Sequence, residues 1–278
     1  MRDSDYITPQ NTELFCNTNE SLLQQPVRAI VLEFPGLGGG SCIGGSMDRG
    51  DYTILHAPAL AQHGVLLAYP FPGPWSWMNP GAVRYADLLV DALRAKHGLG
   101  ADSPLVVTGG SMGGLGALIY TAASRHKVTA CCAACPCVDV PKALAVKPDF
   151  PRTYLSAAMS IDAPLEEALR RFSPIHRVQE LPDIPYHIMQ DLDDELFFEP
   201  DTDAFVAALR TRAAAVSYHK LPGCKHGEFT PEERCFFEAF LLKHAAGAPP
   251  VNPDPAHFTP WSVQPAAQTP QEESHEHS

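Results

Sequence analysis

Apolar residues form short, often β-branched runs along the chain, and longer amphipathic stretches separate these runs. The runs predict buried strands at residues 27–34, 64–70, 103–107, 128–135, 185–190 and 214–221, with an edge strand around 12–16. Apolar residues at helical spacing predict helices over 54–63, 81–97, 115–123, 201–212 and 231–246. Repeated alternation of strand and helix predicts a mostly parallel sheet with helices on both faces.

Two segments depart from this alternation. Residues 138–182 hold short helical pieces separated by prolines, and we interpret them as a small lid-like insertion in one α/β domain over residues 1–246. Residues 247–278 are rich in Pro, Ala, Gln and Glu, which predicts a C-terminal tail outside the packed domain. His275 and His277 in this tail are expected to be solvated.

Charge and composition narrow the class of protein. The chain has 278 residues, 45% of them hydrophobic and 19% charged, with a formal net charge of −12. This acidic balance argues against a nucleic-acid partner and against binding to anionic membranes. No apolar run is long enough to cross a bilayer, and the first residues lack the pattern of a signal peptide, so we expect a cytoplasmic protein without a membrane partner.

Eight cysteines are present, and Cys131, Cys132, Cys135 and Cys137 lie close together. Adjacent residues on a strand point to opposite faces, so Cys131 and Cys132 are poorly placed to share one ion. We therefore predict buried free thiols, which suit a reducing compartment, over the alternatives of a metal site or disulfides.

A serine flanked by glycines lies between the predicted strand at 103–107 and the predicted helix at 115–123. The segment Gly109-Gly110-Ser111-Met112-Gly113 has the Gly-x-Ser-x-Gly pattern of a nucleophile elbow in its strand–turn–helix context. Such a turn projects the serine hydroxyl free of the sheet, and the glycines avoid collisions of a Cβ atom with neighbouring backbone. The alternative is a glycine-rich turn with a purely steric role.

Candidates for the acid and the base follow two later strands. Asp191, Asp193 and Asp194 come after the strand at 185–190, and His226 comes after the strand at 214–221. The carboxyl ends of parallel strands meet at one edge of a sheet, so these groups are expected near Ser111. A nucleophilic serine needs a base, and the base needs an acid that orients it, in the chain order Ser, Asp, His.

By these motifs the chain resembles the α/β-hydrolases, in the branch of small esterases and prolyl-oligopeptidase-type catalytic domains. In that family the acid lies in a Gly-x-x-Asp-x-x-Val pattern. The pattern aligns with Gln190, Asp193 and Leu196, which implies Asp193 as the acid. Gln190 in place of the glycine keeps Asp191 and Asp194 open as alternatives. The turn at residues 222–227 matches the family's histidine turn and implies His226 as the base.

The resemblance also implies an oxyanion hole made of two backbone amides. One is the amide of Met112, and the other comes from the glycine-rich loop at residues 35–39, with Leu37 first and Gly38 second. The same loop could in principle cradle a phosphate. It lacks the Lys-Ser/Thr continuation and the glycine spacing of known phosphate-binding loops.

The predicted function is a serine hydrolase that cleaves a small-molecule ester of a small or medium carboxylic acid, with no metal and no organic cofactor. A prolyl-oligopeptidase-type peptidase and a non-catalytic ligand-binding protein are the alternatives. Trp75 and Trp77 lie in a loop at the same sheet edge and are candidates for a substrate pocket wall. The alternative is that they anchor this proline-rich loop to the body of the domain.

Overall fold

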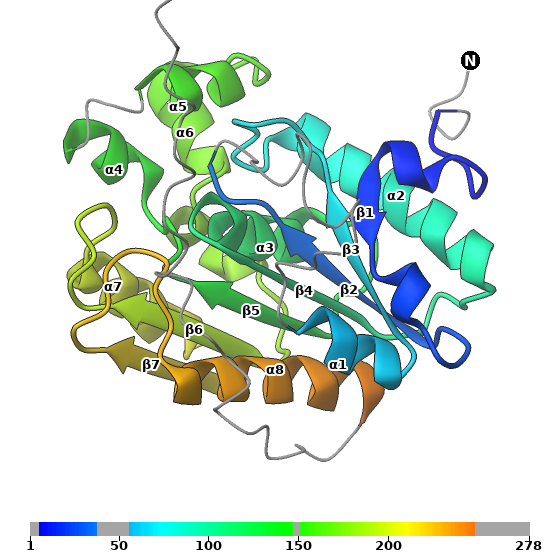
Figure 1. Ribbon diagram of the computed structural model, residues 1–278. Helices are drawn as coiled ribbons and strands as arrows, with labels where there is room; N and C mark the ends of the chain where they lie inside the picture. Colours follow the sequence, from blue (N-terminus) through cyan, green and yellow to red (C-terminus); the bar gives the residue numbers. More distant parts are fainter. Residues whose placement is uncertain (1–5, 38–55, 147–150, 248–278) are drawn as a thin grey trace, which may run out of the picture.

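The computed structural model describes residues 6–37, 56–146 and 151–247, which form one α/β unit around a seven-stranded sheet (Figure 1). The strand order is β1-β3-β2-β4-β5-β6-β7. Only β1 pairs antiparallel, at the edge beside β3, and the other described pairs are parallel. The strands are β1 Cys16–Thr18, β2 Ala29–Phe34, β3 Val65–Pro70, β4 Leu105–Gly110, β5 Ala130–Ala134, β6 Tyr186–Asp191 and β7 Val216–Leu221.

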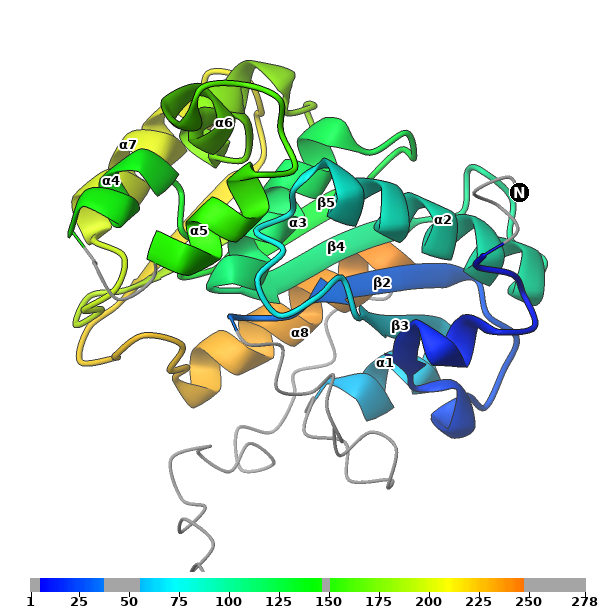
Figure 2. The ribbon, with the colours of Figure 1, turned by 90° about the horizontal axis from the view of Figure 1, so that it is seen from above.

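Helices cover both faces of the sheet, which confirms the predicted architecture (Figure 2). Helices α2 and α3 lie on one face, and α1 and α8 lie on the other. The bounds are α1 Ala57–Gln62, α2 Pro80–His97, α3 Met112–Ala123, α7 Glu199–Leu209 and α8 Pro231–Ala246. Successive side chains of the central strands point to opposite faces of the sheet. In β2, Ile30 and Leu32 pack in the cluster with α2 and α3, while Val31 packs in the cluster with α8.

Most predicted elements are found within a few residues of their expected bounds. The edge strand lies at Cys16–Thr18 instead of around 12–16, because residues 12–14 form a 3₁₀ turn, η2 Thr12–Leu14. The strand that leads to Ser111 runs on to Gly110 and stays paired with β5 up to Ala134. This added length carries Ser111 to the carboxyl edge of the sheet.

The predicted insertion forms short helices that gather on the side toward which β5, β6 and β7 point (Figure 1). These are α4 Val140–Val146, α5 Pro151–Ala158, α6 Leu165–Arg171 and the 3₁₀ helix η6 Pro174–Glu180, and a second short 3₁₀ helix, η3 Glu20–Leu22, lies near the N-terminus. The predicted C-terminal tail lies outside the described residues beyond Gly247. None of the helices in the described segments combines the length and the hydropathy needed to cross a membrane.

The clustered cysteines are buried free thiols, as predicted. Cys131 packs in the cluster on the α3 side of the sheet, and Cys132 packs in the cluster on the α8 side. Burial raises the pKa of Cys131 to about 12, so this thiol is protonated and behaves as a small apolar side chain.

Two glycines allow backbone segments to approach closely around Ser111. A Cβ atom on Gly113 would lie 2.1 Å from the carbonyl oxygen of Phe34 in β2. On Gly109 it would lie 2.6 Å from the carbonyl carbon of Gly113 and 2.8 Å from the oxygen of Phe34. These neighbours are backbone atoms of the sheet and helix, so they cannot rotate away as a side chain would.

We therefore expect Gly113→Ala to destabilise the fold strongly, by more than about 3 kcal/mol, because the methyl group collides with fixed backbone. Gly100→Ala is the matched control, since a Cβ atom there meets nothing within 4 Å. Denaturant unfolding of both variants measures the difference. Equal stability of the two variants would show that the packing around residue 113 is looser than described.

Candidate active site

Ser111 lies in a strained turn between β4 and α3. Its backbone has φ 59° and ψ −124°, in a region that residues with a side chain rarely adopt. The Ser111 amide donates to the carbonyl of Ala134 at 2.9 Å, and the Ser111 carbonyl accepts from Leu115 at 3.1 Å. The turn is thus held from β5 and from the first turn of α3, and the conformation is that of a nucleophile elbow.

His226 comes from the loop after β7 and reaches Ser111. The Oγ atom of Ser111 lies 2.8 Å from Nε2 of His226, within hydrogen-bond distance. The loop turns through Gly223 and Gly227, which both have positive φ. The His226 side chain is 19% exposed, so the ring is largely shielded but open on one side. The structure therefore brings together the predicted nucleophile and the predicted base.

Asp194 contacts the other ring nitrogen, which corrects the expectation that Asp193 does so. The Nδ1 atom of His226 lies 2.7 Å from Oδ2 of Asp194, whose side chain is 1% exposed. The other carboxylate oxygen accepts hydrogen bonds from the amides of Leu196 and Phe197. Asp193 is exposed on the turn.

The physical reason for this correction is the length of β6. The strand continues through Asp191, one residue further than predicted, so the turn that follows is displaced by one position. The Gly-x-x-Asp-x-x-Val pattern therefore aligns with Asp191, Asp194 and Phe197. The spacing of the pattern was right, and its register was wrong by one residue.

Asp191, which the sequence kept open as an alternative acid, is a second buried carboxylate beside Asp194 and does not contact the His226 ring as Asp194 does. It is 2% exposed, and its Oδ2 accepts from the amide of Gly227 at 2.8 Å. Burial and, secondarily, the nearby Asp194 charge raise the pKa of Asp191 to about 6, although hydrogen bonds from the Gly227 amide and the Cys135 thiol act in the opposite direction. Asp191 thus ties the backbone next to His226 to the end of β6.

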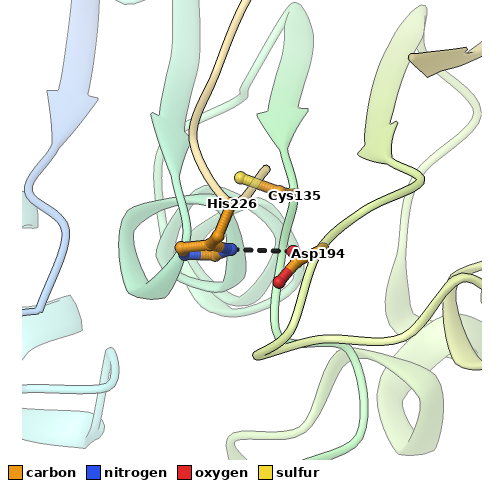
Figure 3. A group of neighbouring side chains, drawn as sticks. All are labelled: Cys135, Asp194 and His226. Carbon is orange, nitrogen blue, oxygen red and sulfur yellow. Dashed lines mark hydrogen bonds and ion pairs between the residues drawn. The ribbon is translucent and has the colours of Figure 1, made fainter. Parts of the chain in front are cut away.

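Cys135 completes the group of side chains behind the histidine (Figure 3). Cys135 directly follows β5 and has a backbone φ of 35°. Its amide donates to the carbonyl of Met189 at 2.8 Å. Sγ of Cys135, the Asp194 carboxylate and a ring nitrogen of His226 lie within 4.8 Å of one another, close enough to hold a metal ion. Burial raises the pKa of this thiol well above its usual value, so Cys135 is protonated while His226 and Asp194 bond each other.

The backbone segments that carry the two predicted oxyanion donors adjoin the elbow. Met112 is the first residue of α3, where backbone amides have no partner within the helix. Leu37 follows β2, which pairs with β4 up to Gly109. A Cβ atom on Gly36 would lie 3.9 Å from the carbonyl of Gly110, so this loop contacts the elbow. Gly38, the second choice, lies outside the described residues.

The two tryptophans of the loop before α2 differ in exposure: Trp77 is buried and Trp75 is partly exposed. Trp77 is 1% exposed, its Nε1 donates to Thr153 at 3.2 Å, and its ring centroid lies 4.3 Å from that of Tyr154. It anchors the loop to α5, which corrects the expectation that it lines a substrate pocket. Trp75 is 37% exposed, with the guanidinium of Arg152 at 5.4 Å from its ring, and its role in substrate binding stays a prediction.

A mostly apolar hollow lies between the insertion and the loop after β6, and Phe197 connects it to the site. The ring of Phe197 contacts the ring of His226 edge-on, with centroids 5.3 Å apart. The lining residues are Pro136, Cys137, Val138, Asp139, Lys142, Ala143, Val146, Leu196, Phe197, Phe198, Asp201 and Thr202. Lys142 bonds Asp201 at 2.7 Å and lies 3.8 Å from Asp139, so one cation faces two carboxylates at the polar end of the hollow.

The chain is similar to known proteins both in sequence and in structure. The family model described as the prolyl oligopeptidase family matches residues 76–247. A search of curated proteins found no match. Among solved structures, a puromycin-hydrolyzing peptidase of Mycobacterium tuberculosis is 15% identical with a TM-score of 0.59; the alignment covers 81% of this chain and 36% of the peptidase.

Two further structures have similar folds. Esterase B from Lactobacillus rhamnosis is 14% identical with a TM-score of 0.54, covering 74% of this chain and 70% of the esterase. The acylaminoacyl peptidase of Pyrococcus horikoshii is 15% identical with a TM-score of 0.58, covering 80% of this chain and 38% of the peptidase. The aligned region therefore spans less than half of each peptidase chain. At these identities the likeness establishes the α/β-hydrolase fold.

We expect Asp194→Asn to lower kcat by about 10³–10⁴-fold, because the amide no longer stabilises the protonated imidazole or holds its tautomer. Asp193→Asn is the matched control on the same turn and is expected to keep kcat within about two-fold, since that side chain is exposed. Steady-state kinetics on a chromogenic ester measures both. A larger loss at residue 193 would contradict the geometry.

The raised pKa of Asp191 predicts a pH-dependent gain in stability for Asp191→Asn. The folded-state pKa lies above the unfolded value of 3.8, so the native carboxyl binds its proton more tightly than the unfolded one. The stability associated with this proton is present below pH 4 and is lost as the pH rises through about 6. At pH 8 the asparagine variant should be more stable, by at most about 3 kcal/mol.

Thermal or denaturant unfolding of wild type and Asp191→Asn at pH 4, 6 and 8 measures this difference. The gain should shrink toward pH 4, where the native carboxyl is already protonated. Asp193→Asn serves as control, because an exposed carboxyl has no such desolvation. A variant that is less stable than wild type at pH 8 would mean that the ionised carboxylate is favoured in the fold.

Proposed function

The chain belongs to the prolyl oligopeptidase family of serine hydrolases, and on this basis we propose that it hydrolyses esters of small or medium carboxylic acids through an acyl-enzyme. The observation that carries the proposal is the hydrogen-bonded chain Ser111–His226–Asp194. Its two contacts measure 2.8 and 2.7 Å, and they join three segments that are far apart in the sequence. A ligand-binding protein without catalysis would have no need of this alignment.

In the acylation step His226 Nε2 takes the proton of Ser111 Oγ while this oxygen attacks the acyl carbon of the ester. The buried Asp194 carboxylate stabilises the imidazolium that forms. The negative charge on the former carbonyl oxygen is stabilised by the amides of Met112 and Leu37. The tetrahedral intermediate then collapses, the ester C–O bond breaks, and His226 gives its proton to the leaving alkoxide.

Deacylation follows the same route with water as the nucleophile. His226 takes a proton from water, the hydroxide attacks the acyl carbon, and the bond to Ser111 Oγ breaks. His226 then returns its proton to Ser111, which restores the resting state, and the carboxylic acid leaves. None of these steps requires a metal or an organic cofactor.

Two features support an ester substrate over a peptide with a free amino terminus. A peptidase that holds such a terminus needs acidic side chains free to face it, and adjacent glutamates are candidates. Among the described residues, Glu166 and Glu167 pair with Arg170 and Arg171 on the surface of α6. Glu233 is bonded to His187 and His219.

The second feature is the apolar character of the hollow that Phe197 connects to His226. Its apolar lining, from Pro136 and Val138 to Leu196 and Phe198, suits an uncharged acyl or alcohol group. The small-molecule ester proposed as substrate would place this group there. Two of the similar structures are peptidases, so hydrolysis of an amide is the alternative that the experiment tests.

Ser111→Ala is expected to lower turnover of p-nitrophenyl acetate by at least about 10⁴-fold, because the acyl-enzyme cannot form. A fluorophosphonate probe should label wild type at Ser111 and leave the variant unlabelled. Labelling and turnover that survive in the variant would place the nucleophile elsewhere.

The choice between ester and amide is tested with p-nitrophenyl esters of increasing acyl length against aminoacyl p-nitroanilides. We expect kcat/KM to be higher for the esters after correction for their spontaneous hydrolysis. We also expect Phe198→Ser, at the partly exposed wall of the hollow, to reduce kcat/KM for the longer acyl chains only. Preferred cleavage of the anilides would favour the peptidase alternative.

A further inference from the structure

Three metal-ligating side chains from three elements meet in a cluster that shares no residue with the Ser111–His226–Asp194 site. They are His187 in β6, His219 in β7 and Glu233 in the first turn of α8. The two carboxylate oxygens of Glu233 lie 2.6 Å from His187 Nε2 and 2.6 Å from His219 Nδ1. One ligand atom from each residue lies within 4.8 Å of the other two.

The carboxylate of Glu233 is removed from water. Its side chain is 5% exposed, that of His187 is fully buried and that of His219 is 35% exposed. The ring of Phe236 packs against both histidines, with centroid distances of 4.6 Å to His187 and 4.4 Å to His219. A carboxylate in such surroundings is costly unless a positive charge compensates it.

The ion pairs of Glu233 within the described chain are with these two histidines. His187 Nδ1 lies 3.0 Å from Ser217 Oγ, which fixes the ring with Nε2 toward Glu233. A buried histidine oriented through its second nitrogen is typical of a metal ligand.

We propose that His187 Nε2, His219 Nδ1 and the carboxylate of Glu233 bind one divalent transition-metal ion, with Zn²⁺ as the best match. Two imidazoles and one carboxylate are a ligand set that Zn²⁺ accepts, whereas Mg²⁺ and Ca²⁺ prefer oxygen ligands alone. The partly exposed side of the cluster at His219 provides an entry path and a fourth position for water.

Binding requires only small changes in the side chains. Ligand atoms on one tetrahedral zinc lie about 3.3 Å apart. One ligand atom of each residue already lies within 4.8 Å of the other two, so these separations must shorten by at most about 1.5 Å. In the metal-bound form each imidazole carries its proton on the nitrogen that does not face the ion. In His187 this is Nδ1, which then donates to Ser217 Oγ, and in His219 it is Nε2.

The ion would join the start of α8 to two strands of the sheet. Thr230, whose hydroxyl accepts from the Glu233 amide at 3.2 Å, links this turn to the loop that carries His226. We therefore assign the ion a stabilising role and no part in ester hydrolysis. This inference stands apart from the proposed function, because none of its ligands touches the reacting atoms.

The test is isothermal titration of the full-length chain with ZnCl₂, and with MgCl₂ as a negative control. All proteins carry His275→Gln and His277→Gln, which removes binding by the terminal histidines. We expect one equivalent of Zn²⁺ with a Kd below about 10 µM and no binding of Mg²⁺. Free Zn²⁺ at about 100 times Kd should raise the Tm by several degrees. A protein that takes up no Zn²⁺ overturns the proposal.

His219→Gln, at the most exposed ligand, should weaken Zn²⁺ binding by at least about 100-fold and abolish the shift in Tm. His244→Gln, on α8 but outside the cluster, is the matched control and should bind as the parent does. Glu233→Gln, with its fold checked by circular dichroism, tests the same site if His219→Gln is poorly folded. Binding that persists in both ligand variants, or that inhibits ester hydrolysis through His226, places the ion elsewhere and overturns the assignment.

Discussion

The close packing of backbone around Ser111 is the constraint on which the rest of the site depends. Gly109 and Gly113 let β4, β2 and the start of α3 approach to distances that exclude a Cβ atom. The turn between them holds Ser111 at φ 59°, which points its hydroxyl out of the sheet edge. The same contact brings the loop after Phe34 against the elbow, so the proposed oxyanion donors and the nucleophile are positioned together.

The histidine is then oriented by a buried group that includes more than one acid. Asp194 bonds the ring, while Asp191 bonds the backbone of Gly227 and lies close to Cys135. Burial makes an ionised Asp191 costly, and repulsion from the nearby Asp194 carboxylate adds to this cost. The pKa of Asp191, raised to about 6, is the result of this arrangement. The buried Asp191 carboxylate thus lowers the stability of the domain near neutral pH, while its hydrogen bond to Gly227 holds the loop that carries His226.

Much of the fold was predictable from local pattern, because strands buried on both faces are apolar throughout and the helices between them are amphipathic. Strands β2 to β7 and helix α8 were recognised in this way. That Cys131 and Cys132 pack on opposite sides of the sheet also followed from alternation. Trp77 was misjudged, because whether an aromatic residue in a loop faces solvent depends on a partner, Tyr154, that lies far along the chain.

By itself the sequence was enough to propose Ser111 as the nucleophile, His226 as the base and the order of the groups, since each depends on a short motif and its flanking elements. Only the tertiary structure decided which acid contacts His226. Asp191, Asp193 and Asp194 are chemically the same and lie within four residues of one another, and a strand one residue longer places Asp194 instead of Asp193 against His226. The meeting of His187, His219 and Glu233 was likewise invisible in the sequence, because it depends on how α8 packs across two strands.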